Sequence, residues 1–165
     1  MRRVGFLYNP ANSANRQGLK QFESDCSKLH FKPVRAPLLE AKEVAAVFGK
    51  LQHDKIQGLI VTPAATLTAW RESIIEQAAK HRLPAIYGQS VYVDAGGLIS
   101  YAANLPDLYR RAAAYADKIF KGAKPGDLPI EQPTKFELVI NLKTAKALGI
   151  KIPDVVMLRA DRVIE

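Results

Sequence analysis

The chain has 165 residues, of which 48% are hydrophobic and 24% are charged, and its formal net charge is +8. These values are typical of one globular domain that buries roughly 70% of its unfolded surface, and no apolar run approaches the ~20 residues of a membrane-spanning helix. The basic residues are spread along predicted helices without aromatic-rich strands beside them, so we interpret them as solvated faces and expect no nucleic-acid partner.

The first half of the chain alternates strand-like runs with amphipathic helical stretches. Apolar runs at residues 4–8, 56–62 and 83–87 predict buried strands, and the run at 31–36 contains Pro33, which predicts an edge strand. The connecting helices are expected at about 16–29, 41–52 and 67–80. This repeated alternation predicts an α/β fold: a three-layer parallel sheet with helices on both faces. The single cysteine, Cys26, lies on the apolar side of the first helix and is interpreted as a buried structural thiol.

After residue 98 the pattern changes. An apolar stripe at residues 105–120 predicts a long helix that Asn104 caps and Gly122 ends. The three prolines between residues 123 and 133 exclude a regular element there. Residues 136–140 resume an apolar strand, residues 141–149 form a short helix, and Pro153 begins the C-terminal tail.

In an open parallel sheet, ligands bind beyond the carboxyl ends of the strands. The candidate site therefore lies in the loops at residues 9–15, 62–66 and 87–97, where small hydroxyl and amide side chains and free backbone N–H groups could hold a carboxylate or phosphate. The candidate ligand-binding residues are Asn9, Ser13, Asn15, Thr62, Thr66, Tyr87, Gly88, Asp94 and Gly96. On composition alone, turn formation and helix capping explain Asn9, Ser13 and Thr66 better than ligand binding does. Asp94 could accept a ligand ammonium or organise the turn at the adjacent glycines.

No catalytic or metal-binding pattern occurs in the sequence. His30, His53 and His81 all fall near predicted helix C-termini, where a cationic side chain favours the helix dipole. Glycine-rich phosphate loops, the hydrolase Gly-x-Ser-x-Gly pattern and His/Cys/Asp clusters at metal spacing are missing. We therefore predict that the chain is not an enzyme and uses no cofactor or metal.

Several stretches resemble ABC-transporter substrate-binding proteins of the branch related to tryptophan and tyrosine transport. They include VGFLYNPAN, KHRLPAIYG and, most specifically, KGAKPGDLPIEQPTKFELVINLKTAKALG. The resemblance covers essentially the whole chain and corresponds to the C-terminal half of those proteins. It implies a type I periplasmic-binding fold, in which two lobes joined by a three-stranded hinge close on a small solute and deliver it to a membrane permease.

The resemblance also implies a division of the chain. Residues 1–94 would form the second lobe, residues 95–133 the hinge and a crossover helix belonging to the first lobe, and residues 134–165 the return to the second lobe. The family's secretory signal and first lobe precede the VGFLYNP strand and are not found here, so we expect a truncated chain. The implied location is periplasmic, or cytoplasmic if Met1 is the true start.

Two functions follow from this resemblance. The favoured one is the solute-binding component of an ABC importer for a small organic solute such as an amino acid or an aromatic acid. The alternative is a cytoplasmic small-molecule-sensing or interaction module of the same fold.

The predicted helix at 105–120 would lack the sheet that it covers in the family. Its apolar stripe comprises Leu105, Leu108, Tyr109, Ala112, Ala116, Ile119 and Phe120. We therefore expect a homodimer through residues 98–122, with a monomer whose helix folds back over its own sheet as the alternative.

Overall fold

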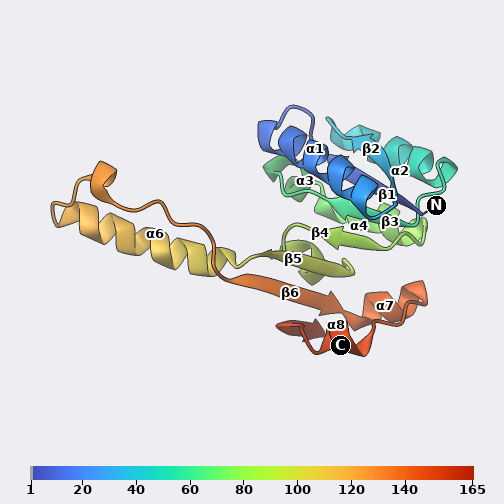
Figure 1. Ribbon diagram of the computed structural model, residues 1–165. Coiled ribbons are helices and arrows are strands. Elements are labelled where there is room, and N and C mark those ends of the chain that lie inside the picture. The colour runs from blue at the N-terminus through green and yellow to red at the C-terminus, as the bar shows by residue number, and fades with distance from the viewer. Residues whose placement is uncertain (1) are drawn as a thin grey trace.

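The computed structural model describes residues 2–165 and is built on one seven-stranded sheet of order β2-β1-β3-β4-β5-β6-β7 (Figure 1). The strands are β1 (Arg3–Tyr8), β2 (Lys32–Pro37), β3 (Gly58–Val61), β4 (Ala85–Tyr87), β5 (Ile99–Ala103), β6 (Phe136–Asn141) and β7 (Arg162–Ile164). Strands β1 to β5 are parallel, whereas β6 is antiparallel to β5 and parallel to β7. The predicted α/β fold is confirmed, with a mixed, mostly parallel sheet.

Eight α-helices surround or leave the sheet. They are α1 (Ser13–Lys28), α2 (Val44–His53), α3 (Ala65–Ala69), α4 (Arg71–Lys80), α5 (Val91–Asp94), α6 (Leu105–Phe120), α7 (Leu142–Leu148) and α8 (Asp154–Met157), as far as residues 2–165 are concerned. Short 3-10 turns occur at Ala41–Glu43 and Pro125–Asp127. No helix in this part of the chain combines the length and the apolar character that crossing a membrane requires.

One face of the sheet carries a row of paired apolar residues across five strands. The row consists of Phe6, Ile60, Ile86, Ile99 and Ile140. At one end α1 covers it, where Phe22 stacks on Phe6 with ring centroids 4.7 Å apart and Cys26 is buried as predicted. At the other end α7 and α8 pack around Ile140.

The opposite face carries the largest core. Its row of paired residues is Leu7, Val61, Tyr87, Ser100 and Val139. Helices α2 to α5 contribute Phe48, Leu67, Ile74 and Tyr92 to the cluster that covers it. Helices therefore cover both faces, which is the three-layer arrangement expected for a sheet of continuous apolar strands.

Four parts of the chain differ from the sequence expectation. The loop expected at 87–97 contains the short helix α5. The helix expected at 67–80 is two helices, because Trp70 ends α3 and begins α4. Strand β5 was not predicted, since Ser100 is buried while Tyr101 is 58% exposed, an arrangement without an apolar run. The expected tail after Pro153 contains α8 and the edge strand β7. The edge position predicted for the strand containing Pro33 is confirmed by β2.

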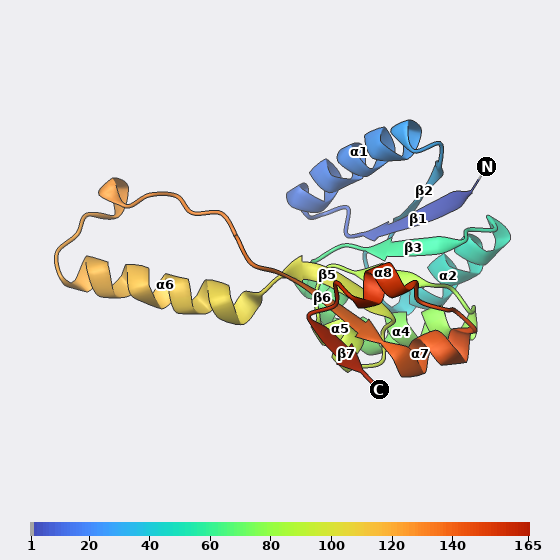
Figure 2. The same ribbon diagram turned by 60° about the horizontal axis from the view of Figure 1, so that its bottom comes forward.

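Helix α6 projects away from the sheet as an arm, and residues 121–135 return alongside it (Figures 1 and 2). Asn104 caps the helix as predicted, accepting a hydrogen bond from Asp107 N, and Gly122 follows its last turn with φ 101°. No residue of α6 is buried. The helix therefore does not fold back over its own sheet.

Candidate functional site

Asn9 directly follows β1, and its hydrogen bonds fix the conformation of the loop after this strand. Its Oδ1 accepts from Ala11 N at 2.8 Å, a turn that asparagine favours, and its Nδ2 donates to Thr66 Oγ1 at 2.8 Å. Its backbone N–H donates to Asn15 Oδ1 at 3.0 Å. Asn9 thus links the end of β1 to the starts of α1 and α3.

Asn15 and Thr62 complete this arrangement, and we call Asn9, Asn15, Thr62 and Thr66 the Asn9 cluster. Asn15 Nδ2 donates to Pro63 O at 3.0 Å, and the Thr62 hydroxyl lies 3.0 Å from both Leu7 O and Asn15 Oδ1. Asn15 and Thr62 are buried, so their polar groups tie the two loops together. The structure therefore brings these four candidate residues to one edge of the sheet, as the ends of neighbouring parallel strands require.

Two of the candidates are exposed at this edge. Ser13 is the first residue of α1, and Thr66 lies in the first turn of α3. The first turn of α1 also carries a cation, because the Arg16 guanidinium donates to Pro10 O at 2.7 Å. Free N–H groups at a helix N-terminus and a neighbouring cation favour an anionic group of a ligand.

Tyr87 and Gly88 give the edge its shape at the end of β4. Tyr87 is buried, its ring stacks on Tyr92 with centroids 4.7 Å apart, and burial raises the pKa of its hydroxyl. A Cβ at Gly88 would lie 2.6 Å from Pro63 Cδ and 3.0 Å from Pro63 N. The loops after β3 and β4 therefore approach each other at a distance that only glycine allows.

The sequence reasoning missed Thr68 and Gln89 at this edge. The Thr68 hydroxyl lies 2.6 Å from Gln89 Oε1 and 2.9 Å from Ala64 O, and both side chains are half-buried. Gln89 directly follows Gly88, so an amide residue just beyond a strand end was the signal available. These two residues extend the polar edge from the Asn9 cluster toward β4.

Asp94 and Gly96 lie elsewhere. The Asp94 carboxylate is 2.7 Å from Arg162 Nη1 on β7, and the Gly96 carbonyl accepts from Thr144 Oγ1 of α7 at 2.8 Å. Helix α7 begins beyond the end of β6, which lies beside the amino end of β5 because the two strands are antiparallel. The structure therefore does not bring these two candidates to the Asn9 cluster. Asp94 is paired with an arginine, and the φ of 106° at Gly96 suits a glycine turn.

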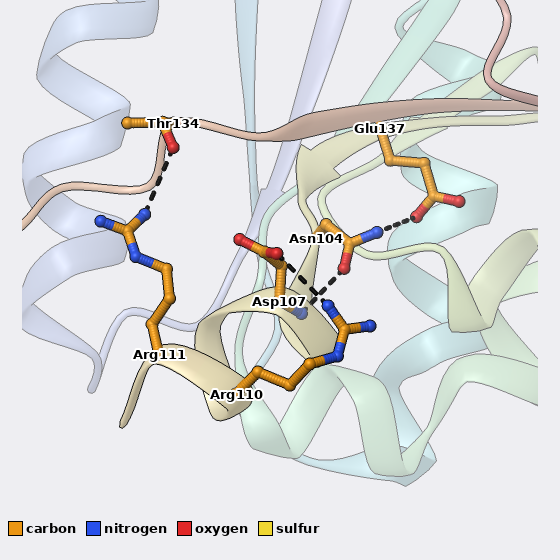
Figure 3. Close-up of polar contacts among 6 residues, drawn as sticks. All are labelled: Asn104, Asp107, Arg110, Arg111, Thr134 and Glu137. Atoms are coloured by element: carbon orange, nitrogen blue, oxygen red, sulfur yellow. Dashed lines mark hydrogen bonds and ion pairs between the residues drawn. The ribbon is translucent and has the colours of Figure 1, made fainter. Parts of the chain in front are cut away.

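The arm leaves the body at the same edge as the Asn9 cluster, because β5 is parallel to β4 and ends there. Figure 3 shows the polar contacts at its root: Asn104 Nδ2 donates to Glu137 Oε2 at 3.4 Å, and Arg111 Nη1 donates to Thr134 Oγ1 at 3.2 Å. Asn104 N also donates to Lys135 O at 3.0 Å. The outgoing and returning segments are thus tied together where they meet the sheet.

The polar side chains gathered at this edge are amides, hydroxyls and one guanidinium. Tyr87 and Gly96 both line a cavity, but its volume of about 20 Å³ is enough for one water molecule and not for an amino acid. His30, His53 and His81 lie at the C-terminal ends of α1, α2 and α4, as predicted. Within residues 2–165 no group of three or more His, Cys, Asp or Glu residues is placed to hold a metal ion.

Known proteins share this sequence pattern and this fold. The model of the family described as ABC transporter substrate binding protein matches residues 1–164. A tyrosine-binding protein of Clostridioides difficile (strain R20291) is 22% identical over 150 residues, which are 91% of this chain and 43% of that protein.

Solved structures match over nearly the whole chain. A conserved domain protein from Vibrio cholerae is 26% identical with a TM-score of 0.88, covering 98% of this chain and 54% of that one. The ABC domain in complex with L-Trp from Streptococcus pneumoniae is 24% identical, also at 0.88, covering 99% and 56%. A ligand-free, open substrate binding protein with adhesive properties from Clostridium difficile is 23% identical with a TM-score of 0.74, covering 99% and 54%. The chain thus spans about half the length of the proteins that it matches.

Proposed function

Because the chain belongs to the family of ABC transporter substrate-binding proteins, we propose that it is the solute-binding part of an ABC importer. In this proposal the carboxyl edge of the sheet, with the Asn9 cluster, supplies one wall of the solute site. A second lobe supplies the other wall, and a membrane permease receives the solute. The corresponding location is the periplasmic or outer side of the membrane, and the chain is not an enzyme.

The position of the arm is the observation that carries this proposal. The chain leaves the sheet after Ala103 and returns at Phe136, two residues that are paired across β5 and β6. Both connections therefore cross the edge where the Asn9 cluster lies. A lobe reached through these connections would face the cluster across a cleft, where ligand sites of two-domain proteins commonly form.

The proposal keeps the division of the chain into three segments. Residues 1–94 and 134–165 form one lobe, and residues 95–133 form the hinge and the crossover. Within the middle segment, β5 is hydrogen-bonded into the sheet of the lobe, so the crossover itself begins at Asn104. Asn104 and Glu137 then mark the two hinge connections.

The solute in this proposal is a small organic acid, with an aromatic amino acid as the favoured member. Ser13, Thr66 and the N-terminus of α1 supply donors for its carboxylate, and Arg16 adds a positive charge beside them. The relatives named for tyrosine and for L-Trp support this class. One wall leaves much of such a ligand in water, so the chain alone should bind it with a Kd of about 1 mM or weaker.

The test is a two-dimensional NMR titration of the ¹⁵N-labelled chain with L-tryptophan and L-tyrosine, and with L-lysine as a cationic comparison. We expect amide shifts confined to residues 9–16, 62–68 and 87–90. The double variant Ser13→Ala/Thr66→Ala should weaken them, whereas Ser27→Ala, at the far end of α1, should not. Shifts outside these loops, no shift with any of the solutes, or submicromolar binding by a demonstrated monomer would contradict the proposal.

A further inference from the structure

The loops of the candidate site offer hydrogen-bond donors to a solute but no carboxylate. We call residues 9–16, 62–68 and 87–90 the site loops. Arg16 is the one charged residue in their sequence, which contains no Asp or Glu. Asp94, which was considered as an acceptor for a ligand ammonium, is paired with an arginine of β7 at 2.7 Å. A solute ammonium therefore finds no carboxylate in the site loops.

The amide oxygens after β1 are turned toward the protein. Asn9 Oδ1 accepts from Ala11 N at 2.8 Å, and Asn15 Oδ1 accepts from Asn9 N at 3.0 Å. Asn12 Oδ1 accepts from Asn15 N at 3.2 Å as the cap of α1. These three oxygens organise the loop and the helix start, so none of them is directed at a ligand.

Gln89, at the end of β4, also has its oxygen engaged. The Thr68 hydroxyl donates to Gln89 Oε1 at 2.6 Å, a length typical of an O–H···O bond. This contact turns Nε2, which carries two hydrogens, away from Thr68. The buried side-chain atoms that lack a partner within residues 2–165 are Tyr92 Oη and Ser100 Oγ. Gln89 Nε2, which also lacks a partner in that part of the chain, is therefore accessible as a donor.

Thr66 offers a second donor whose direction the protein fixes. Its Oγ1 accepts from Asn9 Nδ2 at 2.8 Å, which leaves the hydroxyl hydrogen for a ligand. Thr66 is exposed, as is the hydroxyl-bearing Ser13 at the start of α1. These hydroxyls and the Arg16 guanidinium suit the oxygens of a carboxylate.

The two fixed donors belong to different strand ends. Thr66 is bonded to Asn9, directly after β1, whereas Gln89 follows β4. Because β3 lies between β1 and β4 in the sheet, the two strand ends are roughly 10 Å apart, which is two strand spacings. An aromatic carboxylic acid with a hydrogen bond at each end has a comparable length.

We propose that the site loops recognise the oxygens of a solute and not its ammonium group. The carboxylate lies at Thr66, Ser13 and Arg16, and Gln89 Nε2 donates to a second oxygen at the other end of the molecule, such as a phenolic hydroxyl. This inference rests on the proposed function and adds to it the kind of organic acid that this lobe selects. Any contact with an amino group comes from outside the site loops.

The first test concerns the amino group and uses NMR titrations of the ¹⁵N-labelled chain. L-phenylalanine and hydrocinnamate differ only in that group. Because the site loops hold a guanidinium and no carboxylate, hydrocinnamate should bind at least as tightly as L-phenylalanine. Tighter binding of L-phenylalanine would overturn the inference.

The second test concerns the far oxygen. Phloretate is hydrocinnamate with a para-hydroxyl group, and in the wild type this group should lower the Kd by about 2- to 10-fold, the effect of one neutral hydrogen bond. Gln89→Leu, which keeps the bulk of the side chain without its amide, should abolish the difference and leave the Kd of hydrocinnamate unchanged. Gln21→Leu, which replaces an exposed glutamine of α1 that is bonded to Asp25, is the matched control and should keep the difference.

The outcomes separate this inference from the proposed function. If the wild type does not prefer phloretate, or if the preference survives in Gln89→Leu, the inference fails and the proposed function stands. The same holds if L-tryptophan shifts the site loops and hydrocinnamate does not. If none of these solutes shifts the site loops, both fail. Far-ultraviolet circular dichroism verifies that the two variants are folded.

Discussion

The side chain of Asn15 joins two loops that come from different strands. It accepts from Asn9 N and donates to Pro63 O, each at 3.0 Å, and it is 4% exposed. Removing it breaks the part-buried bond to Pro63 O and leaves the buried Asn9 N–H without a partner, which costs more than that hydrogen bond itself contributed. Asn15 is therefore a buried residue that fixes the two loops of the candidate site relative to each other.

We predict that Asn15→Ala lowers the free energy of unfolding by about 2–4 kcal/mol. Asn12→Ala is the control, because it removes only the N-cap bond to Asn15 N and should cost about 1 kcal/mol. Urea denaturation followed by circular dichroism measures both. Equal losses in the two variants would show that the buried contacts of Asn15 add nothing beyond helix capping.

Tyr92 makes the free energy of unfolding depend on pH in the alkaline range. Burial raises the pKa of Tyr92 to about 12, whereas tyrosine in an unfolded chain titrates near 10. Between these values the unfolded chain has lost the proton and the folded chain has kept it. The free energy of unfolding is therefore unaffected below about pH 10 and falls above it by about 1.4 kcal/mol per pH unit, until the folded pKa is reached.

We predict that Tyr92→Phe removes the part of the decrease in the free energy of unfolding above pH 10 that is due to Tyr92. The Tyr92 hydroxyl is near Thr68 but makes no hydrogen bond of normal length within residues 2–165, because the Thr68 hydroxyl is engaged by Ala64 O and Gln89 Oε1. The variant should therefore be about as stable as wild type at pH 8. Tyr87, whose pKa is also raised by burial, keeps part of the pH dependence in both proteins. Urea midpoints at pH 8 and pH 11 measure the effect, and parallel losses in the two proteins would contradict it.

Part of the candidate site could be predicted because parallel strands end at a common edge. That rule correctly gathers Asn9 and Thr62, which follow β1 and β3 directly. It fails for Asp94 and Gly96, because α5 turns the chain away from the edge after Gln89 and carries them toward the amino end of β5. Position along a loop does not reveal such a turn.

At the scale of elements, burial decided which ones the sequence could predict. β1 and β3 lie inside the sheet, and both appear in the sequence as continuous apolar runs. β5 also lies inside it, but its outer face is partly open at Tyr101, which stacks on Phe136 of β6 with centroids 5.6 Å apart. Strand β7 has only three residues and depends on its pairing with β6. The formation of β5 and β7 therefore depends more on pairing with neighbouring strands than on the hydrophobic pattern of their own residues.

Arg111 is the main side-chain link between α6 and the segment that returns beside it. We predict that Arg111→Ala accelerates cleavage after Glu131 by a glutamate-specific protease by a factor of roughly 3 to 10, because the contacts of Arg111 with Glu131, Gln132 O and Thr134 oppose detachment of the segment. Lys121→Ala, which removes only an exposed pair with Asp117, is the control. Mass spectrometry of the fragments measures the cleavage rate at this site in the wild type and in both variants. An unchanged rate in Arg111→Ala would show that other contacts hold the segment.

At the scale of the whole molecule, the arm and the sheet are separate structures. The arm contributes no buried residue from α6, and its root is held by exposed or half-buried polar contacts such as the one between Asn104 and Glu137. The apolar stripe predicted for this helix was correct as a pattern, but a pattern does not say what covers it. The apolar pattern alone could not place the helix outside the body; the resemblance to the family, which assigned residues 95–133 to a crossover into another lobe, led to that expectation.

This separation predicts that the body folds without the arm. Ala103 and Phe136 are directly opposite each other in the antiparallel pair of β5 and β6, so a two-residue Asn-Gly turn can replace residues 104–135. We expect the shortened chain to keep its free energy of unfolding within about 1 kcal/mol, because the shorter loop offsets the removal of a few hydrogen bonds at the root of the arm. It should keep the amide shifts with L-tryptophan at residues 9–16, because the Asn9 cluster lies wholly within the body. A loss of cooperative unfolding would show that the arm supports the sheet.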